Sequence, residues 1–137
     1  MNNVAMRSRS AALFVALVTA VLSAIACQRS EAKIKPIEPA ELAERMQKGT
    51  APVILDVRSR EEYAAEHIRG AINIPYDQLA ERIDRLPLAK SDEIVVHCER
   101  GRRAATAEEI LAAAGYQNLR DLTGHMQAWQ ENGLPVE

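Results

Sequence analysis

Short apolar runs alternate along this chain with more polar segments that begin and end at residues typical of helix boundaries. The apolar runs predict buried strands at residues 53–55, 71–74, 94–97 and 118–122. The segments between them predict helices at residues 39–47, 60–66, 77–86, 104–114 and 125–132. Strands separated by helices predict an α/β domain with a central, mostly parallel sheet covered by helices on both faces.

Individual residues support these helix boundaries. Pro39 is suited to the first turn of the helix that it opens, and Gly49 and Gly115 follow predicted helix ends. Ser59 and Glu62 have the spacing of a capping box, in which each side chain bonds the backbone N–H of the other residue. The helix after strand 53–55 is therefore expected to begin directly after Ser59.

Cys98 stands at the end of strand 94–97, in the turn before a predicted helix. Ligands of open parallel sheets bind beyond the carboxyl ends of the strands, and Asp56 ends another strand at that edge. Three arginines follow Cys98 within five residues: Arg100, Arg102 and Arg103. Nearby cations and a helix N-terminus favour the thiolate form of a cysteine. An inert buried cysteine is the alternative, but the charged residues beside Cys98 favour a reactive sulfur.

Length and composition restrict the class of protein. The chain has 137 residues, enough for one domain, and its 47% hydrophobic and 26% charged residues are ordinary for a globular protein. A formal net charge of −2 gives no bulk attraction for a polyanion, so nucleic acid is not an expected partner. The histidines are far apart in the sequence and show no metal-ligand spacing, so neither a metal nor another cofactor is expected.

Residues 1–26 have the pattern of a secretory signal peptide. Two arginines precede an apolar stretch of about 16 residues, which is short for a membrane span of about 20. Small residues then precede Cys27, an order that resembles the lipobox of bacterial lipoproteins, in which the cysteine carries the lipid. We expect an exported protein on the periplasmic or cell-envelope side, held at a membrane by lipid on Cys27. Cleavage that leaves Cys27 unmodified is the alternative.

Residues 27–35 are expected to form a polar tether, and residues 36–137 the folded domain. The chain has only two cysteines, Cys27 and Cys98. Lipidation of Cys27 would therefore leave Cys98 without a disulfide partner.

Three segments resemble the motifs of rhodanese-like domains. Residues Asp56 to Tyr63, followed by His67 to Pro75, are similar to the N-terminal signature of the family. Residues Cys98 to Arg103 are similar to its active-site loop, cysteine-x-x-glycine-x-arginine. Residues Leu122 to Val136 are similar to the closing motif, except that His125 stands where the family usually has a second glycine. This exception is expected to affect the backbone under the pocket and not the reactive loop.

The resemblance implies a rhodanese-like three-layer fold and sulfurtransferase activity. The Cys98 thiolate would take sulfane sulfur from a small anionic donor such as thiosulfate, and the resulting persulfide would pass it to a thiol or to cyanide. Backbone N–H groups from Glu99 to Arg103 would hold the charge of the persulfide. Gly101 would permit the backbone turn.

The charged residues near the loop have different expected roles. Arg103 matches the loop-closing arginine of the family and is expected to tie the loop or to contact the oxygens of the donor. Arg100 and Arg102 are expected to point outward and to attract anions at the pocket mouth. Asp56 and Arg58 are expected to support the base of the loop through an ion pair.

Two other functions remain open. Cysteine-dependent phosphatases also have a His-Cys pair followed by an arginine, but five residues separate their cysteine and arginine, whereas four separate Cys98 from Arg103. The shorter loop suits a sulfur atom better than a phosphate. A binding or sulfur-relay module without turnover would need the same cysteine, so the sequence separates it poorly from an enzyme.

Overall fold

The computed structural model describes residues 34–137. The expected signal peptide, Cys27 and most of the expected tether lie outside the described residues. Five strands form one sheet in the order β1-β5-β4-β2-β3, and every pairing between neighbouring strands is parallel. In this order the strands are Lys35–Ile37, Asn118–Leu122, Glu93–His97, Val53–Asp56 and Ile72–Asn73. The predicted parallel sheet is confirmed, and β4, which precedes Cys98, is its middle strand.

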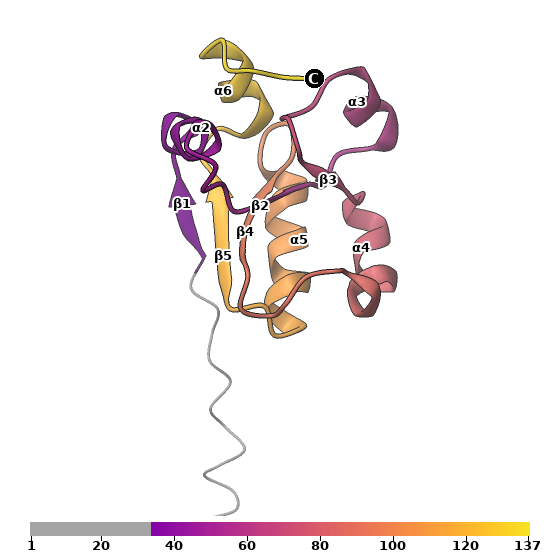
Figure 1. Ribbon diagram of the computed structural model, residues 1–137. Helices are drawn as coiled ribbons and strands as arrows, with labels where there is room; N and C mark the ends of the chain where they lie inside the picture. The colour runs from indigo at the N-terminus through magenta and orange to yellow at the C-terminus, as the bar shows by residue number, and fades with distance from the viewer. Residues whose placement is uncertain (1–33) are drawn as a thin grey trace, which may run out of the picture. The chain divides into compact units, whose positions relative to one another are not determined.

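Helices cover both faces of this sheet (Figure 1). Helices α2 (Pro39–Gln47) and α6 (His125–Glu131) lie on one face, and α4 (Tyr76–Arg82) and α5 (Arg102–Ala113) lie on the other. Helix α3 (Arg60–Ala65) follows the carboxyl end of β2. The C-terminus lies close to α3 in Figure 1, where His67 and Glu137 exchange two backbone hydrogen bonds of 2.9 Å. The predicted three-layer α/β architecture is confirmed.

The alternation of side chains along β4 divides the core into two layers. Ile94 and Val96 pack with Leu111 of α5, whereas Val95 packs with Trp129 of α6 on the other face. Cys98 continues the first of these layers. Truncating a fully buried aromatic residue such as Trp129 to alanine is expected to cost about 3–5 kcal/mol, so the layer under α6 contributes strongly to stability.

Two helices have a boundary that differs from the predicted one by more than one residue. Helix α5 begins at Arg102 and not at residue 104, because Gly101 turns the chain directly into the helix with a φ of 106°. The helix predicted for residues 77–86 begins at Tyr76, after Pro75, and tightens after Arg82 into the 3₁₀ turn Ile83–Arg85. Both arginines that follow Gly101 therefore lie in the first turn of α5.

One strand is shorter than predicted, and another, β1, was not predicted. Strand β3 is limited to Ile72–Asn73, because only these residues pair with β2. Strand β1 begins at Lys35, inside the segment expected to be a tether, because Lys35 pairs with Arg120 of β5. Residues far apart in the sequence make both pairings, so local pattern did not indicate these limits.

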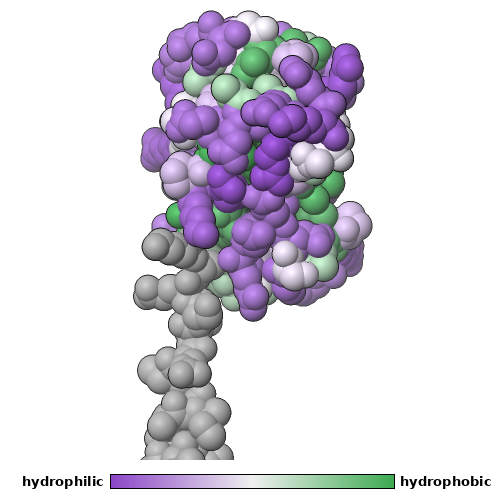
Figure 2. Space-filling model, turned by 60° about the vertical axis from the view of Figure 1, so that its left-hand side comes forward, coloured by the Kyte–Doolittle hydropathy of each residue, from purple (hydrophilic) through white to green (hydrophobic). Residues whose placement is uncertain are grey.

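The surface is mostly polar. Figure 2 shows a face that is largely hydrophilic, with hydrophobic residues in small separate areas. Within residues 34–137, the large hydrophobic side chains that are exposed belong to Ile34 and Tyr76. In the same residues no helix has both the length and the hydrophobicity needed to cross a bilayer. The groups of chemical interest lie where β2 and β4 end.

Candidate active site

Cys98 lies at the carboxyl end of β4 and is only 1% exposed. The backbone N–H of Gly101 donates a hydrogen bond to its Sγ atom over 3.0 Å. The first turn of α6 also holds this loop in place. The N–H groups of Met126 and Gln127 donate hydrogen bonds to the carbonyl oxygens of Cys98 and Glu99, over 3.0 and 3.3 Å. The sulfur therefore sits under a fixed loop, beside a backbone donor that favours negative charge on sulfur.

Arg103 connects this loop to α3. Its guanidinium donates two hydrogen bonds to the carboxylate of Glu62, and the Nη2–Oε1 distance is 2.8 Å. These bonds are the main cause of a raised Arg103 pKa, to which the nearby Cys98 sulfur also contributes. In return, the Arg103 hydrogen bond lowers the pKa of Glu62 to about 2. Arg103 therefore stays charged and ties α5 to α3 near the cysteine loop.

Glu62 was not predicted as a site residue. The sequence identified it only as a capping-box residue, and the structure contains that capping box: the Ser59 N–H donates to Glu62 Oε2 over 3.0 Å, and the Glu62 N–H donates to Ser59 Oγ over 3.2 Å. The same carboxylate also binds Arg103. One signal in the sequence could have identified Glu62 as a site residue. The carboxyl ends of parallel strands lie at the same edge of a sheet, so the residues that follow β2 and β4 are expected to lie close together.

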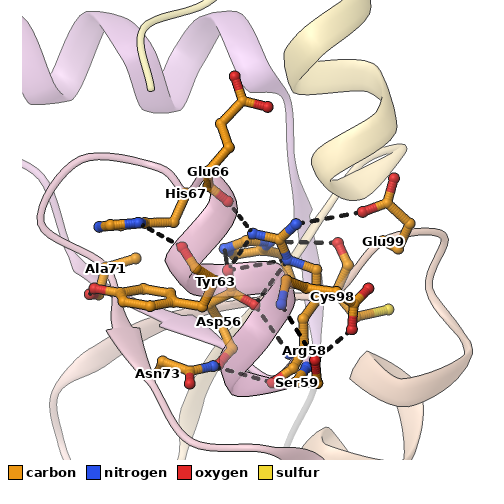
Figure 3. Close-up of polar contacts among 12 residues, drawn as sticks. Asp56, Arg58, Ser59, Tyr63, Glu66, His67, Ala71, Asn73, Cys98 and Glu99 are labelled. Carbon is orange, nitrogen blue, oxygen red and sulfur yellow. Dashed lines mark hydrogen bonds and ion pairs between the residues drawn. The ribbon is translucent and has the colours of Figure 1, made fainter. Parts of the chain in front are cut away.

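Arg58 occupies the base of the site and is buried (Figure 3). Its Nη2 atom lies 2.8 Å from Asp56 Oδ2, and it donates a further 2.8 Å bond to the carbonyl of Glu66. Its Nη1 atom lies 3.4 Å from Glu99 Oε2. Burial opposes the charge of Arg58, but the hydrogen bond and charge of Asp56 outweigh burial and raise its pKa. Arg58 thus links β2, α3 and the cysteine loop, and it acts as a support.

His97 lies next to this ion pair and is fully buried. It pairs in register with Asp56, and its Nε2 atom lies 3.7 Å from Asp56 Oδ2. Burial is the main reason that its pKa is lowered to about 4. His97 is therefore neutral at pH 7 and belongs to the support under the loop.

Cationic residues surround the outside of the loop. Arg100 and Arg102 are exposed, on the loop and in the first turn of α5. A polar hollow of about 230 Å³ lies beside Arg103, and its other lining residues are Ser59, Arg60, Glu61, Pro75, Tyr76, Asp77 and Gln78. Within residues 34–137, no group of histidine, cysteine and acidic side chains is placed to hold a metal ion. Arg100 and Arg102 therefore present positive charge to solvent beside the cysteine loop.

His125 contacts the reactive loop, so the expectation that it affects only the backbone under the pocket was wrong. It is 7% exposed and has a φ of 56° at the start of α6. A Cβ atom placed on Gly101 would lie 2.6 Å from His125 Nε2. The imidazole therefore lies directly against the glycine that donates to Cys98.

Comparisons with known proteins agree with this geometry. The model of the family described as "Rhodanese-like domain" matches residues 38–132. "Thiosulfate sulfurtransferase 16, chloroplastic" from Arabidopsis thaliana is 37% identical over 93 residues, which cover 61% of this chain and 78% of that protein. "Thiosulfate sulfurtransferase PspE" from Escherichia coli (strain K12) is 41% identical over 70 residues, which cover 51% and 67% of the two chains.

Solved structures show the same architecture. The Alr3790 protein from Anabaena sp. aligns with a TM-score of 0.69 at 33% identity, covering 74% of this chain and 81% of the other. A rhodanese-related protein from Thermoplasma volcanium aligns with a TM-score of 0.66 at 35% identity, covering 75% and 97%. The family match includes the cysteine loop and extends over most of the described domain. This chain therefore belongs to the rhodanese-like domain family.

Proposed function

We propose that this protein is a sulfurtransferase that moves sulfane sulfur from thiosulfate, or a similar small anionic donor, to a thiophilic acceptor through a Cys98 persulfide. The observation that carries the proposal is the 3.0 Å hydrogen bond from the Gly101 N–H to the Cys98 sulfur in a loop bordered by arginines. Two relatives that are named thiosulfate sulfurtransferases support it.

The first step is a displacement at sulfur. The Cys98 thiolate attacks the outer sulfur of thiosulfate, a new S–S bond forms at Sγ, and the S–S bond of thiosulfate breaks. Sulfite leaves with the electron pair of that bond. No external oxidant or reductant is needed, because the sulfane sulfur keeps its oxidation level as it moves to the enzyme.

The second step returns the thiolate. The acceptor, cyanide or a deprotonated thiol, attacks the outer sulfur of the persulfide and forms thiocyanate or a new persulfide. The Cys98–sulfur bond breaks, and its electron pair stays on Cys98. The charge therefore remains on sulfur throughout, next to the Gly101 N–H and the Arg103 guanidinium, and fixed donors of this kind stabilise charge without reorganising.

The size of the site favours a sulfur atom over a phosphate. Four residues separate Cys98 from Arg103, and Arg103 is already bound at two points to Glu62. Because Cys98 is 1% exposed, the sulfur is reached only by a small molecule or by a thin, extended thiol. A dianion would first meet the exposed charges of Arg100 and Arg102.

The test compares the parent protein with Cys98→Ser. Thiosulfate:cyanide transfer and the added mass of one sulfur atom after thiosulfate treatment are both expected in the parent and both absent in the variant, since a hydroxyl group cannot form the persulfide. Cys27→Ser is the matched control and should retain both. Persulfide formation without turnover on cyanide or thiols would indicate a relay module. Absence of both from the parent would refute the proposal.

The proposal extends to location: residues 1–26 direct export, and lipid on Cys27 holds the domain at the cell envelope. The basic start, the apolar stretch and the small residues before Cys27 support it. Intact mass of the mature protein tests it, because processing at Cys27 and a diacylglyceryl addition change the mass by different amounts. A mature protein with an unmodified N-terminal Cys27 would refute lipidation and leave export standing.

A further inference from the structure

His125 has a backbone conformation that is uncommon for residues other than glycine. Its φ of 56° lies in the left-handed region, and within residues 34–137 every other residue with a positive φ is a glycine. A non-glycine residue in this region loses free energy, and such residues cluster at functional sites when the surrounding structure holds them in place. Gly124, directly before it, also has a positive φ, of 68°. The turn into α6 therefore holds a side chain at a position that favours glycine.

The imidazole of His125 fills the space over Gly101. The 2.6 Å distance between His125 Nε2 and a Cβ built on Gly101 is shorter than real contacts of that kind. The ring therefore occupies the side of Gly101 where another residue would carry its side chain. Gly101 in turn has a φ of 106° and directs its N–H at the Cys98 sulfur. His125 therefore contacts the residue whose N–H donates the hydrogen bond on which the proposed function rests.

The carboxyl group of Asp121 faces the same ring nitrogen that lies against Gly101. Asp121 of β5 places Oδ1 at 3.7 Å from His125 Nε2. Glu108 of α5 is 5% exposed, and its Oε1 atom has no hydrogen-bond partner within residues 34–137. Burial, followed by the nearby Asp121 carboxyl group, raises the pKa of Glu108 to about 8. Glu108 is thus mainly protonated at pH 7, and Asp121 is the acidic residue that faces His125.

Burial also disfavours the charged form of the His125 imidazole. Burial lowers the pKa of His125, and the charge of Asp121 opposes this shift only in part. His97 at the end of β4 is a further titratable group whose pKa responds to His125. His125 Nδ1 is buried without a hydrogen-bond partner in the described part of the chain. A buried ring with an unsatisfied nitrogen in a strained turn costs stability, and the structure places that ring against the cysteine loop.

We propose that His125 is a positioning residue of the cysteine loop: its imidazole packs on Gly101 and keeps the Gly101 N–H directed at the Cys98 sulfur. This role rests on the proposed sulfurtransferase function for its effect on turnover. Its effect on the sulfur itself can be measured without turnover.

The experiment replaces His125 with glycine, the residue that its φ favours, and with asparagine, which tolerates positive φ but has no ring. Asn132→Gly is the matched control, because it loosens the other end of α6, where the Asn132 side chain bonds the carbonyl of Ala128. Two measurements need no sulfur donor: the pH midpoint of Cys98 alkylation by iodoacetamide, and hydrogen exchange at the Gly101 amide. The third is the rate of thiosulfate:cyanide transfer.

Both His125 variants should raise the alkylation midpoint, by roughly 1 pH unit if a charge-assisted hydrogen bond is largely lost. Exchange at the Gly101 amide should become faster. Turnover should fall roughly tenfold, less than the loss seen when an oxyanion-hole donor is removed outright. Asn132→Gly should leave the midpoint unchanged.

An unmoved alkylation midpoint in folded His125→Gly would overturn the proposal, whether or not turnover falls. An equal shift in Asn132→Gly would overturn it too, because the effect would then come from the stability of α6. If His125→Gly does not fold, the same comparison is decided with His125→Asn. A shifted midpoint in a protein whose parent transfers no sulfur would uphold the positioning role and refute the proposed function.

Discussion

The Arg103 guanidinium and the Glu62 carboxylate form a two-point ion pair that joins the first turn of α5 to α3, across 41 positions of the sequence. Glu62 also completes the capping box with Ser59, so one carboxylate starts a helix and holds the arginine beside the reactive sulfur. The pair therefore couples the local structure after β2 to the geometry of the loop after β4.

Glu62→Gln tests this coupling, because glutamine keeps the capping interaction but removes the charge that binds Arg103. We expect turnover with thiosulfate to fall roughly three- to tenfold, with a stability loss below about 1 kcal/mol, since the pair is partly exposed. Glu62→Ala removes the cap as well and should be less stable than Glu62→Gln. Unchanged kcat in Glu62→Gln would show that Arg103 keeps its position without the ion pair.

The same pair has a defined pH dependence. The pKa of Glu62 is lowered from 4.5 to about 2 in the folded state, so its contribution is present above pH 4.5 and is lost as the pH falls toward 2. Urea unfolding at several acidic pH values measures this. The parent should lose more stability than Glu62→Gln over that interval.

Arg100 and Arg102 are expected to act through long-range attraction of the donor. Replacing each with glutamine should raise KM for thiosulfate by about two- to fivefold and change kcat little, because exposed charges steer an anion without contacting it. The effect should shrink at high salt, since the Debye length is about 8 Å at physiological ionic strength. Arg85→Gln, another exposed arginine but on the turn after α4, is the control. If the parent and both arginine variants have the same KM at low salt and at high salt, Arg100 and Arg102 do not steer the donor.

The buried Asp56–Arg58 pair is expected to matter for stability. Asp56→Ala leaves a buried guanidinium with fewer partners and should cost about 3–5 kcal/mol of unfolding free energy. The double variant Asp56→Ala/Arg58→Met should be more stable than Asp56→Ala alone, because it also removes the unpaired charge. Urea denaturation of the two variants and the parent measures both values. A double variant less stable than the single variant would contradict this account.

His97 is expected to destabilise the fold in acid. Its pKa is lowered from 6.5 to about 4, chiefly by burial, so the unfolded chain binds the proton more readily than the folded protein does. Stability should therefore fall as the pH drops from about 6.5 to about 4, by about 3 kcal/mol in total. His97→Gln removes this slope. If the unfolding free energy of His97→Gln falls with pH as steeply as that of the parent, another group causes the acid sensitivity.

Glu108 should produce the opposite slope. Its pKa is raised from 4.5 to about 8, first by burial and then by Asp121, so the folded protein holds this proton more tightly than the unfolded chain. Stability is therefore expected to fall as the pH rises from about 4.5 to about 8. Glu108→Gln mimics the protonated acid and should flatten this part of the curve. Thermal melting across the interval gives the comparison, and a parallel fall in the variant would contradict the assignment.

The sequence by itself determined the features that depend on neighbouring residues. The apolar runs and boundary residues indicated the strand–helix order from α2 onward, and the structure contains the Ser59–Glu62 capping box that starts α3. The position of Cys98 in a turn between a buried strand and a helix also followed from local pattern. Each of these signals spans only a few residues, because backbone hydrogen bonding and capping act over that distance.

Only the tertiary structure decided which distant segments meet. The pairing of β1 with β5 made Lys35 part of the sheet, and the meeting of the loops after β2 and β4 turned a capping glutamate into the partner of Arg103. The packing of α6 against the cysteine loop likewise placed His125 on Gly101. Such contacts depend on the packing of whole elements in three dimensions. A pattern of single residues predicts that these elements exist but does not specify which side chains their packing brings together.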